Sequence, residues 1–300
     1  MLGMLFTNAI DTFIKWKEVY APTAAKRYRP RLYKLLYSLG DNLSLEVLTN
    51  DDVVRFHKKM EADGYSRATM AFSLTVVKNF LVFWRNRGQT VPDPKEIRGI
   101  TFASRIKPIV TPEDFERMSK VLDEYRFNDL RMKLAIHMLW DTGMRISELV
   151  GLNISDIKDP NEAGIRTAQI LSRKSAKYNL VAWSKETDRL LCLYLGVRLS
   201  NDIHSDALFI DTRPDRCQKL DVRSLQRWVK IVAIRAGVTK SITPHSFRHG
   251  KAHYMLNNGA NIRDVQAVLR HVNPITTFHY LSLNEKQFLD VAEKHLKVAA

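Results

Sequence analysis

Six residues in the second half of the chain have side chains that could cut a phosphodiester: Arg145, Lys174, His245, Arg248, His271 and Tyr280. A guanidinium is planar and permanently charged, so two arginines can hold the non-bridging oxygens of a phosphate by paired hydrogen bonds. A histidine can donate a hydrogen bond or move a proton near neutral pH. A lysine can protonate a departing alkoxide, and a tyrosine hydroxyl can attack the phosphorus and hold the cut strand covalently.

Two short motifs contribute the arginines. TGMRISEL contains Arg145 and Glu148, and HSFRHG contains His245 and Arg248 one helical turn apart, so both of the latter can reach a common ligand. These motifs resemble the first-arginine box and the His-x-x-Arg box of the tyrosine recombinase (phage integrase) family. The resemblance assigns Arg145 and Arg248 to the phosphate clamp and His245 to proton transfer at the nucleophile. It assigns Glu148 to support of the arginine geometry.

A third segment, LRHVNPITTFHY, places His271 nine residues before Tyr280, which is the spacing of the family. The resemblance makes Tyr280 the nucleophile and His271 a further ligand of the phosphate oxygens. Tyr254 and Tyr178 are interpreted as half-buried packing residues, the usual role of an isolated tyrosine. The family often has glycine directly before this histidine, and Arg270 stands there instead, which adds a positive charge.

The lysine is expected in a hairpin. Residues 166–183 alternate weakly between apolar and polar side chains around RKSAK, which predicts a β-hairpin with Lys174 or Lys177 at its tip. The hairpin of the family is often glycine-rich, and this one has no glycine, so both lysines remain candidates. Lys174 lies at the position that aligns with the family, and it is assigned as the general acid for the leaving 5′-oxygen. Lys177 is the alternative.

Positive charge is spread along the whole chain. The 300 residues include 47 Lys and Arg against 32 Asp and Glu, a net charge of +15. Residues 1–104 hold 16 basic and 10 acidic residues and the remainder holds 31 and 22, so both parts are basic, by +6 and +9. Two basic domains suit a DNA backbone, although a solvated helix face explains any single charge better. The candidate DNA contacts are Lys26, Arg27, Arg29, Arg31, Arg67, Lys177 and Arg270.

Apolar periodicity and capping residues predict a mainly helical chain. In the first hundred residues, helices are expected to start at Thr23, after an N-cap at Thr49 or Asn50, and after an N-cap at Ser66. The fold class is therefore mainly α with a small β-sheet. The resemblance divides it into an N-terminal helical core-binding domain of the SAM-like type and an α+β catalytic domain of the tyrosine-recombinase type.

A proline-rich segment near residues 98–111 is predicted to link the two domains. We place a helical core-DNA-binding domain at 1–104 and a catalytic domain, with the nucleophile and a C-terminal helix, at 105–300. Thr111 and Pro112 have the pattern of an N-cap followed by a first-turn proline, which predicts the first helix of the catalytic domain.

Several classes of protein are disfavoured. Cys192 and Cys217 lie in no metal-like spacing and suggest a reducing compartment without a disulfide framework. The nine histidines form no metal-binding pattern and no P-loop is present, so no metal, ATP or other cofactor is expected. The N-terminus lacks the features of a signal peptide, and no uncharged stretch could span a bilayer. The expected location is the cytoplasm or nucleoid.

The resemblance implies strand exchange between two double-stranded DNA sites. The intermediate would be a 3′-phosphotyrosyl link with a free 5′-hydroxyl, and four protomers would act through a Holliday junction. An amphipathic helix predicted over 285–297 would dock into a neighbouring protomer. The N-terminal part has room for a core-binding domain without an arm-binding domain, which favours a Xer-like or Cre-like recombinase. A type IB topoisomerase, which uses a similar set of residues, and a DNA-binding accessory protein that no longer cuts are the alternatives.

Overall fold

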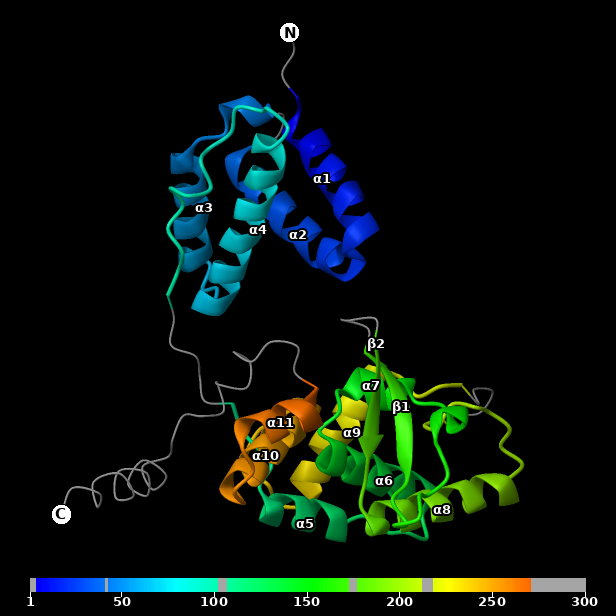
Figure 1. Cartoon of the computed structure of the whole chain (residues 1–300). Coiled ribbons are helices and arrows are strands. Elements are labelled where there is room, and N and C mark those ends of the chain that lie inside the picture. The colour runs from blue at the N-terminus through cyan, green and yellow to red at the C-terminus, as the bar shows by residue number, and fades with distance from the viewer. Residues whose placement is uncertain (1–3, 41–42, 102–106, 173–176, 212–217, 271–300) are drawn as a thin grey trace, which may run out of the picture. The chain divides into compact units, whose positions relative to one another are not determined.

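The chain divides into two compact units (Figure 1). Residues 1–105 form the N-terminal unit, and residues 106–300, which include all the predicted catalytic residues, form the second unit, here named the catalytic unit. The computed structural model describes residues 4–40, 43–101, 107–172, 177–211 and 218–270. Among these residues most of the structure is helical, and the strands form one two-stranded antiparallel sheet. The predicted fold class is thereby confirmed. No described helix is long and apolar enough to cross a membrane.

The described part of the N-terminal unit is built on four α-helices. They are α1 (Phe6–Tyr20), α2 (Pro22–Leu39), α3 (Asn50–Ala62) and α4 (Arg67–Arg85). Aromatic rings from α1 and α4 meet in the core. The ring centroid of Phe13 lies 5.5 Å from that of Phe80 and 5.1 Å from that of Phe83. Burial of such large apolar side chains is the main force that holds the helices together.

Side-chain caps determine where these helices begin. Thr49, and not Asn50, caps α3: its hydroxyl accepts the backbone N–H of Asp52 at 3.2 Å, and the Asp52 carboxylate accepts the Thr49 N–H at 2.9 Å. Ser66 caps α4 as predicted. Helix α2 begins one residue earlier than predicted, at Pro22, because proline has a fixed φ and no N–H and therefore suits a first turn.

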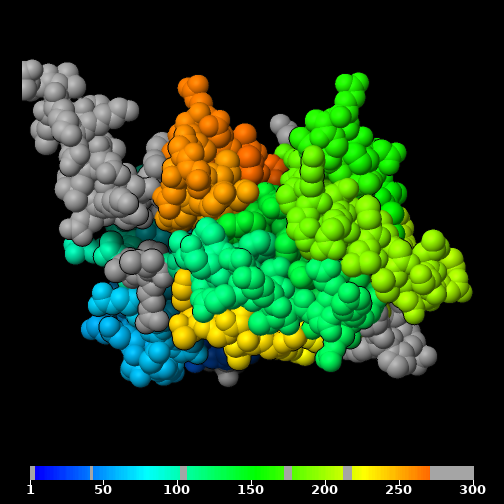
Figure 2. Space-filling model, turned by 90° about the horizontal axis from the view of Figure 1, so that it is seen from below, coloured from blue at the N-terminus to red at the C-terminus, as the bar shows by residue number. Residues whose placement is uncertain are grey.

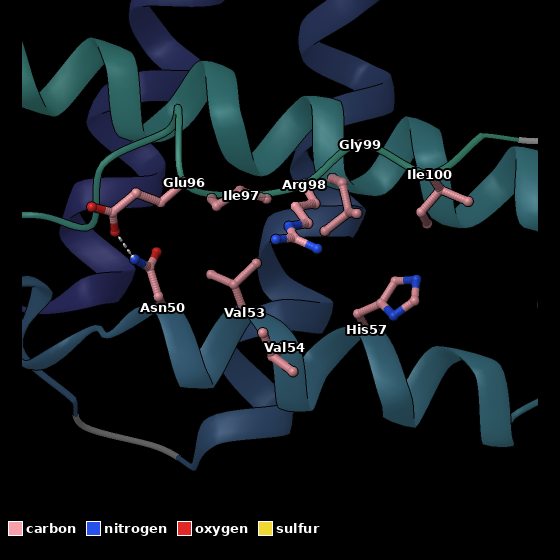
Figure 3. Close-up of a pocket in the computed structure, with 10 residues that line it drawn as sticks. Asn50, Val53, Val54, His57, Glu96, Ile97, Arg98, Gly99 and Ile100 are labelled. Carbon is pink, nitrogen blue, oxygen red and sulfur yellow. Dashed lines mark hydrogen bonds between the residues drawn. The ribbon is translucent and has the colours of Figure 1, made fainter.

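An apolar hollow of about 400 Å³ lies on the N-terminal unit, between α3 and the segment that follows α4 (Figure 3). Val53 lines it from α3, and Ile97 and Ile100 line it from the other side. At one end the side-chain amide of Asn50 donates a hydrogen bond to the carboxylate of Glu96. The hollow contains none of the predicted catalytic residues.

In the described part of the catalytic unit, helices surround a central, almost fully buried one, α6. The helices are α5 (Pro112–Lys120), α6 (Phe127–Thr142), α7 (Ile146–Gly151), α8 (Lys185–Ser200), α9 (Val222–Arg235), α10 (Pro244–Asn257) and α11 (Ile262–Leu269). Helix α6 packs against α5, α7, α8, α9 and α10. Because it is covered on nearly all sides, it has no single apolar face. Figure 2 shows the face on which α5 lies between α8 and α10.

The sheet is the predicted hairpin. Strands β1 (Thr167–Ser172) and β2 (Lys177–Ala182) are antiparallel, with Thr167 opposite Ala182 and Ser172 opposite Lys177. Side chains alternate between the two faces, so Val181 is buried while Tyr178 is 69% exposed. This corrects the expectation that Tyr178 is half-buried: it lies on the outer face of the strand.

Two buried arginines of the catalytic unit donate hydrogen bonds to its internal loops. Arg131 donates to the carbonyl of Ile210, and Arg198 donates to the carbonyls of Ala207 and Leu208 at 2.8 and 2.9 Å. Both side chains are buried. Each guanidinium satisfies loop carbonyls that would otherwise be buried without a partner. These two positive charges therefore hold loops in place and do not belong to a DNA-facing surface.

Candidate active site

Arg145 lies at the junction of α6 and α7. Gly143 ends α6 in the left-handed conformation, with φ 56°, which glycine adopts without strain. Arg145 then caps α7, and Glu148 lies one turn further on. One carboxylate oxygen of Glu148 accepts the backbone N–H of Arg145 at 2.8 Å, and the other accepts its guanidinium Nη1 at 2.8 Å. Glu148 therefore fixes both the backbone and the charged group of Arg145, as the sequence predicted.

Glu148 is charged although it is buried. Its side chain is 5% exposed, whereas that of Arg145 is 30% exposed. Burial acts to raise the pKa of the Glu148 carboxyl, but the two hydrogen bonds from Arg145 and the positive charges of Arg270 and Arg145 outweigh it and hold the pKa below its usual range. The carboxylate is thus a fixed negative charge directly behind the Arg145 guanidinium.

Arg248 connects the two arginine motifs. It lies on α10, is 4% exposed, and donates from Nη1 to the carbonyl of Gly143 at 2.7 Å. Its Nη2 donates to the carbonyl of Leu269, the last residue of α11. Residues that are 105 positions apart in the sequence therefore meet at the turn between α6 and α7. Arg248 joins this turn to the end of α11.

His245, the second residue of α10, lies within the field of both arginines. It is exposed, yet loss of part of its water shell, followed by the positive charges of Arg248, Arg145 and Lys107, lowers the pKa of its imidazole. A lowered pKa keeps the ring neutral near pH 7, and a neutral imidazole can accept a proton. His245, Arg248 and Arg145 are thus brought to one place.

Arg270 follows α11 and points inward. Its side chain is 8% exposed, and its Nη1 donates to the carbonyls of Val268 at 2.7 Å and Thr142 at 3.3 Å. Its Nη2 lies 3.5 Å from the Glu148 carboxylate. The guanidinium was predicted to contact DNA, but in the structure it lies inside the catalytic unit, beside the carboxylate that holds Arg145.

Three of the predicted catalytic residues, Lys174, His271 and Tyr280, lie outside the described residues. Lys177 is the first residue of β2, at the end of the hairpin where Lys174 follows β1 in the sequence. Arg270, the last described residue, directly precedes His271. The last described residues, Leu269 and Arg270, contact Arg248 and Glu148 respectively.

Comparison with known proteins accounts for this arrangement. Residues 108–287, more than half of the chain, match the phage integrase family, and residues 11–88 match the N-terminal SAM-like domain of phage integrases. The chain belongs to the phage integrase family. It is a tyrosine-type site-specific DNA recombinase, an enzyme that cleaves and rejoins DNA strands.

The chain is similar to Xer recombinases over most of its length. It is 28% identical over 245 residues to the tyrosine recombinase XerC of Mannheimia succiniciproducens, which covers 81% of this chain and 80% of the relative. The fold is similar to that of the XerH site-specific recombinase bound to a palindromic difH substrate in a post-cleavage complex. That similarity has a TM-score of 0.77 and 20% identity and covers 94% and 83% of the two chains. A lambda integrase tetramer bound to a Holliday junction matches with a TM-score of 0.73 and 13% identity, over 93% and 77%.

Two further residues of this recombinase, Gly250 and His249, lie next to the predicted set, and sequence reasoning missed the first and gave the second only a secondary role. A Cβ at Gly250 would lie 2.1 Å from the carbonyl oxygen of Val110, so only glycine lets the segment before α5 run against α10. His249 is desolvated and lies near Lys107, His245 and other positive groups, which lowers its pKa to about 4. The last two letters of HSFRHG were the available signal, but Val110, which lies against Gly250, and Lys107, which acts on His249, are both more than 100 positions away.

The predicted DNA contacts of the N-terminal unit fall into three groups. The guanidinium carbons of Arg27 and Arg31 both lie 4.5 Å from the ring centre of Phe72 on α4, a cation–π arrangement that orients two charges together. Arg29, on the same helix, instead pairs with Asp11 of α1 at 3.1 Å. The remaining two, Lys26 and Arg67, are exposed.

Proposed function

We propose that this recombinase cuts DNA by attack of the Tyr280 hydroxyl on the scissile phosphate, which leaves a 3′-phosphotyrosyl link and a free 5′-hydroxyl. The observation that carries the proposal is the meeting of two motifs at the α6–α7 turn, where Arg248 bonds to Gly143 two residues before Arg145. The phosphate gains negative charge in the transition state, and two positioned guanidinium groups stabilise that charge more than they stabilise the ground state.

The other roles follow from proton movement. His245, held neutral by its surroundings, accepts the proton of Tyr280 as the new phosphorus–oxygen bond forms. His271 donates a hydrogen bond to a non-bridging oxygen, and Lys174 gives its proton to the departing 5′-oxygen, with Lys177 as the alternative. The phosphotyrosyl ester conserves the bond energy. A 5′-hydroxyl from a second strand can therefore displace Tyr280 and rejoin the DNA without a cofactor.

We also propose that four copies of the chain act on two double-stranded DNA sites. The positive charge of both parts of the sequence suits a DNA backbone. The XerH complex with difH and the lambda integrase tetramer on a Holliday junction support DNA as the partner and a tetramer as the assembly. The helix predicted over 285–297 would join neighbouring protomers. Removal of residues 285–300 should then preserve cleavage of a single bound site and abolish recombination between paired sites.

The covalent step can be tested with a nicked suicide substrate. After cleavage, the fragment that carries the free 5′-hydroxyl diffuses away, so the strand cannot be rejoined and the adduct is trapped. The wild-type protein should form the adduct, Tyr280→Phe should bind the same DNA without forming it, and Tyr254→Phe should behave as wild type. Peptide mapping of the adduct identifies the attached residue. An adduct on Tyr254 or Tyr178 would show that the nucleophile is misassigned.

A further inference from the structure

Arg270 occupies a position where an arginine backbone is strained. It ends α11 with φ 56° and ψ 46°, in the left-handed region that glycine adopts freely and other residues reach at a cost. The backbone alone would favour glycine at this helix end. The side chain must therefore provide something that offsets the strain, and its contacts lie inside the catalytic unit.

The contacts of Arg270 are with the machinery that holds Arg145. Its Nη1 bonds to the carbonyl of Thr142 in the turn before Arg145, and its Nη2 lies 3.5 Å from the Glu148 carboxylate. Among the described residues, Nε and Nη2 of Arg270 have no hydrogen-bond partner, so the contact with Glu148 is one of charge. Glu148 is thus a single buried carboxylate shared by two guanidinium groups.

The charges of these three groups explain why a second arginine matters. Glu148 and Arg145 alone form a neutral pair, and the carboxylate would then cancel part of the field that Arg145 exerts on a phosphate. With Arg270 on the other side of the carboxylate, the three groups together carry one net positive charge. Because Glu148 and Arg270 are both buried, water screens their mutual contact little.

We propose that Arg270 is a positioning residue that offsets the charge of Glu148, so that Arg145 keeps its positive charge for the scissile phosphate. The inference rests on the proposed function of Arg145 in cleavage. Glu148 then fixes the geometry of Arg145 through hydrogen bonds without neutralising it, and the bond of Arg270 to Thr142 joins the end of α11 to the same turn.

The test is a double-substitution cycle, measured as single-turnover cleavage of the suicide substrate at saturating DNA. Arg270→Gln should slow cleavage about tenfold or more, a change of at least about 1.4 kcal/mol in the barrier. Arg270→Lys, which keeps the charge, should recover most of the rate. Arg263→Gln removes an exposed arginine from the same helix and should leave the rate near that of the wild type.

The decisive comparison is the variant with both Arg270→Gln and Glu148→Gln. If Arg270 acts by offsetting the carboxylate, removal of that carboxylate should restore part of the rate that Arg270→Gln loses. A merely structural role predicts the opposite, a double variant that is slower than either single one, and that result would overturn the proposal. Arg270→Gly, which relieves the backbone strain and keeps the chain folded, should show the same slow cleavage and the same rescue.

A second readout does not depend on cleavage. The pKa of the Glu148 carboxyl can be followed by carbon NMR in free protein with labelled glutamate, with Glu148→Gln to assign the signal. Arg270→Gln should raise this pKa and Arg263→Gln should not. An unchanged pKa would disprove the charge contact, whereas a wild-type protein that shows the contact but forms no adduct would disprove the proposed function alone.

Discussion

In the proposed mechanism, Arg248 serves both the fold and the reaction. Its guanidinium holds the carbonyls of Gly143 and Leu269, and it lies one turn from His245. Arg145 differs, because it is partly exposed and its guanidinium is held by Glu148. Removal of either arginine should therefore impair cleavage. Removal of Arg248 should also leave the carbonyls of Gly143 and Leu269 without this donor.

Arg145→Ala and Arg248→Ala should each lower the cleavage rate by on the order of 10²–10³, because each removes a contact that strengthens in the transition state. DNA affinity should change much less, since many other phosphate contacts remain. Arg248→Ala should also reduce the free energy of unfolding more than Arg145→Ala, because each buried carbonyl left without a donor costs about 1–3 kcal/mol. Single-turnover cleavage, DNA titration and urea unfolding measure the three effects. Cleavage at a near wild-type rate in both variants would contradict the clamp.

The general acid can be identified by changing the leaving group. A sulfur in place of the bridging 5′-oxygen leaves as a thiolate and does not need a proton. Lys174→Ala should therefore cut an ordinary site slowly and a 5′-phosphorothiolate site almost as fast as wild type, and Lys177→Ala should show little defect on either. Arg145→Ala, as the control, should stay slow on both substrates. Sulfur rescue of Lys177→Ala instead would mean that the hairpin lysines are assigned in the wrong register.

At the scale of elements, α10 is held in place by close backbone contact. The N–H of Val110 donates to the carbonyl of Ser246 at 3.1 Å, and Gly250 lies one turn further along the same face. His245 and Arg248 project from this helix, so their positions depend on how closely the segment before α5 can approach it. The absence of a side chain at Gly250 is what allows that approach.

Two glycine substitutions should have opposite effects on stability. Gly250→Ala should destabilise the catalytic unit by about 2 kcal/mol or more, because the new methyl group overlaps a backbone carbonyl that cannot move alone. Gly196→Ala, in the middle of α8 where a Cβ would meet nothing within 4 Å, should stabilise it by about 0.5–1 kcal/mol through helix propensity. Urea unfolding followed by circular dichroism measures both. A neutral Gly250→Ala would show that the segment and α10 are not in contact in solution.

At the scale of the whole molecule, net charge is a poor guide to the DNA-facing residues. The chain carries a net charge of +15, yet Arg131, Arg198 and Arg270 hold internal groups of the catalytic unit. In the N-terminal unit Arg27 and Arg31 are oriented by Phe72, whereas Arg29 is paired with carboxylates of α1. We expect DNA affinity to depend much more on Arg27 and Arg31, which an aromatic ring orients, than on Arg29, which is paired with carboxylates.

Salt dependence can separate these arginines. Each phosphate contact contributes about 0.9 to the slope of log affinity against log salt concentration for duplex DNA. Substitution of both Arg27 and Arg31 by Gln should lower that slope by about 2 and weaken binding, while cleavage at saturating DNA stays unchanged. Arg29→Gln should change the slope by less than half of the contribution of one phosphate contact. Equal changes for Arg27→Gln and Arg29→Gln would indicate that charge alone, without orientation by Phe72, determines binding.

Much of the fold was predictable because it depends on neighbours in the sequence. The caps at Ser66 and Thr111 and the hairpin around residues 167–182 all arise from local chemistry: side-chain oxygens near free N–H groups and alternating side chains. Tyr178 was misjudged because the degree of exposure of a strand residue depends on what covers each face, which no local pattern contains.

The candidate site divides in the same way. The sequence by itself predicted its chemistry, since TGMRISEL and HSFRHG each place their charged residues on one helical turn, and the family resemblance assigned Glu148 to the support of Arg145. Only the tertiary structure decided that Arg248 bonds to Gly143, that Gly250 admits Val110 and that Arg270 turns inward to Glu148. Each of these contacts joins residues more than 100 positions apart, so the packing of the helices decides which guanidinium faces a phosphate and which is buried beside a carboxylate.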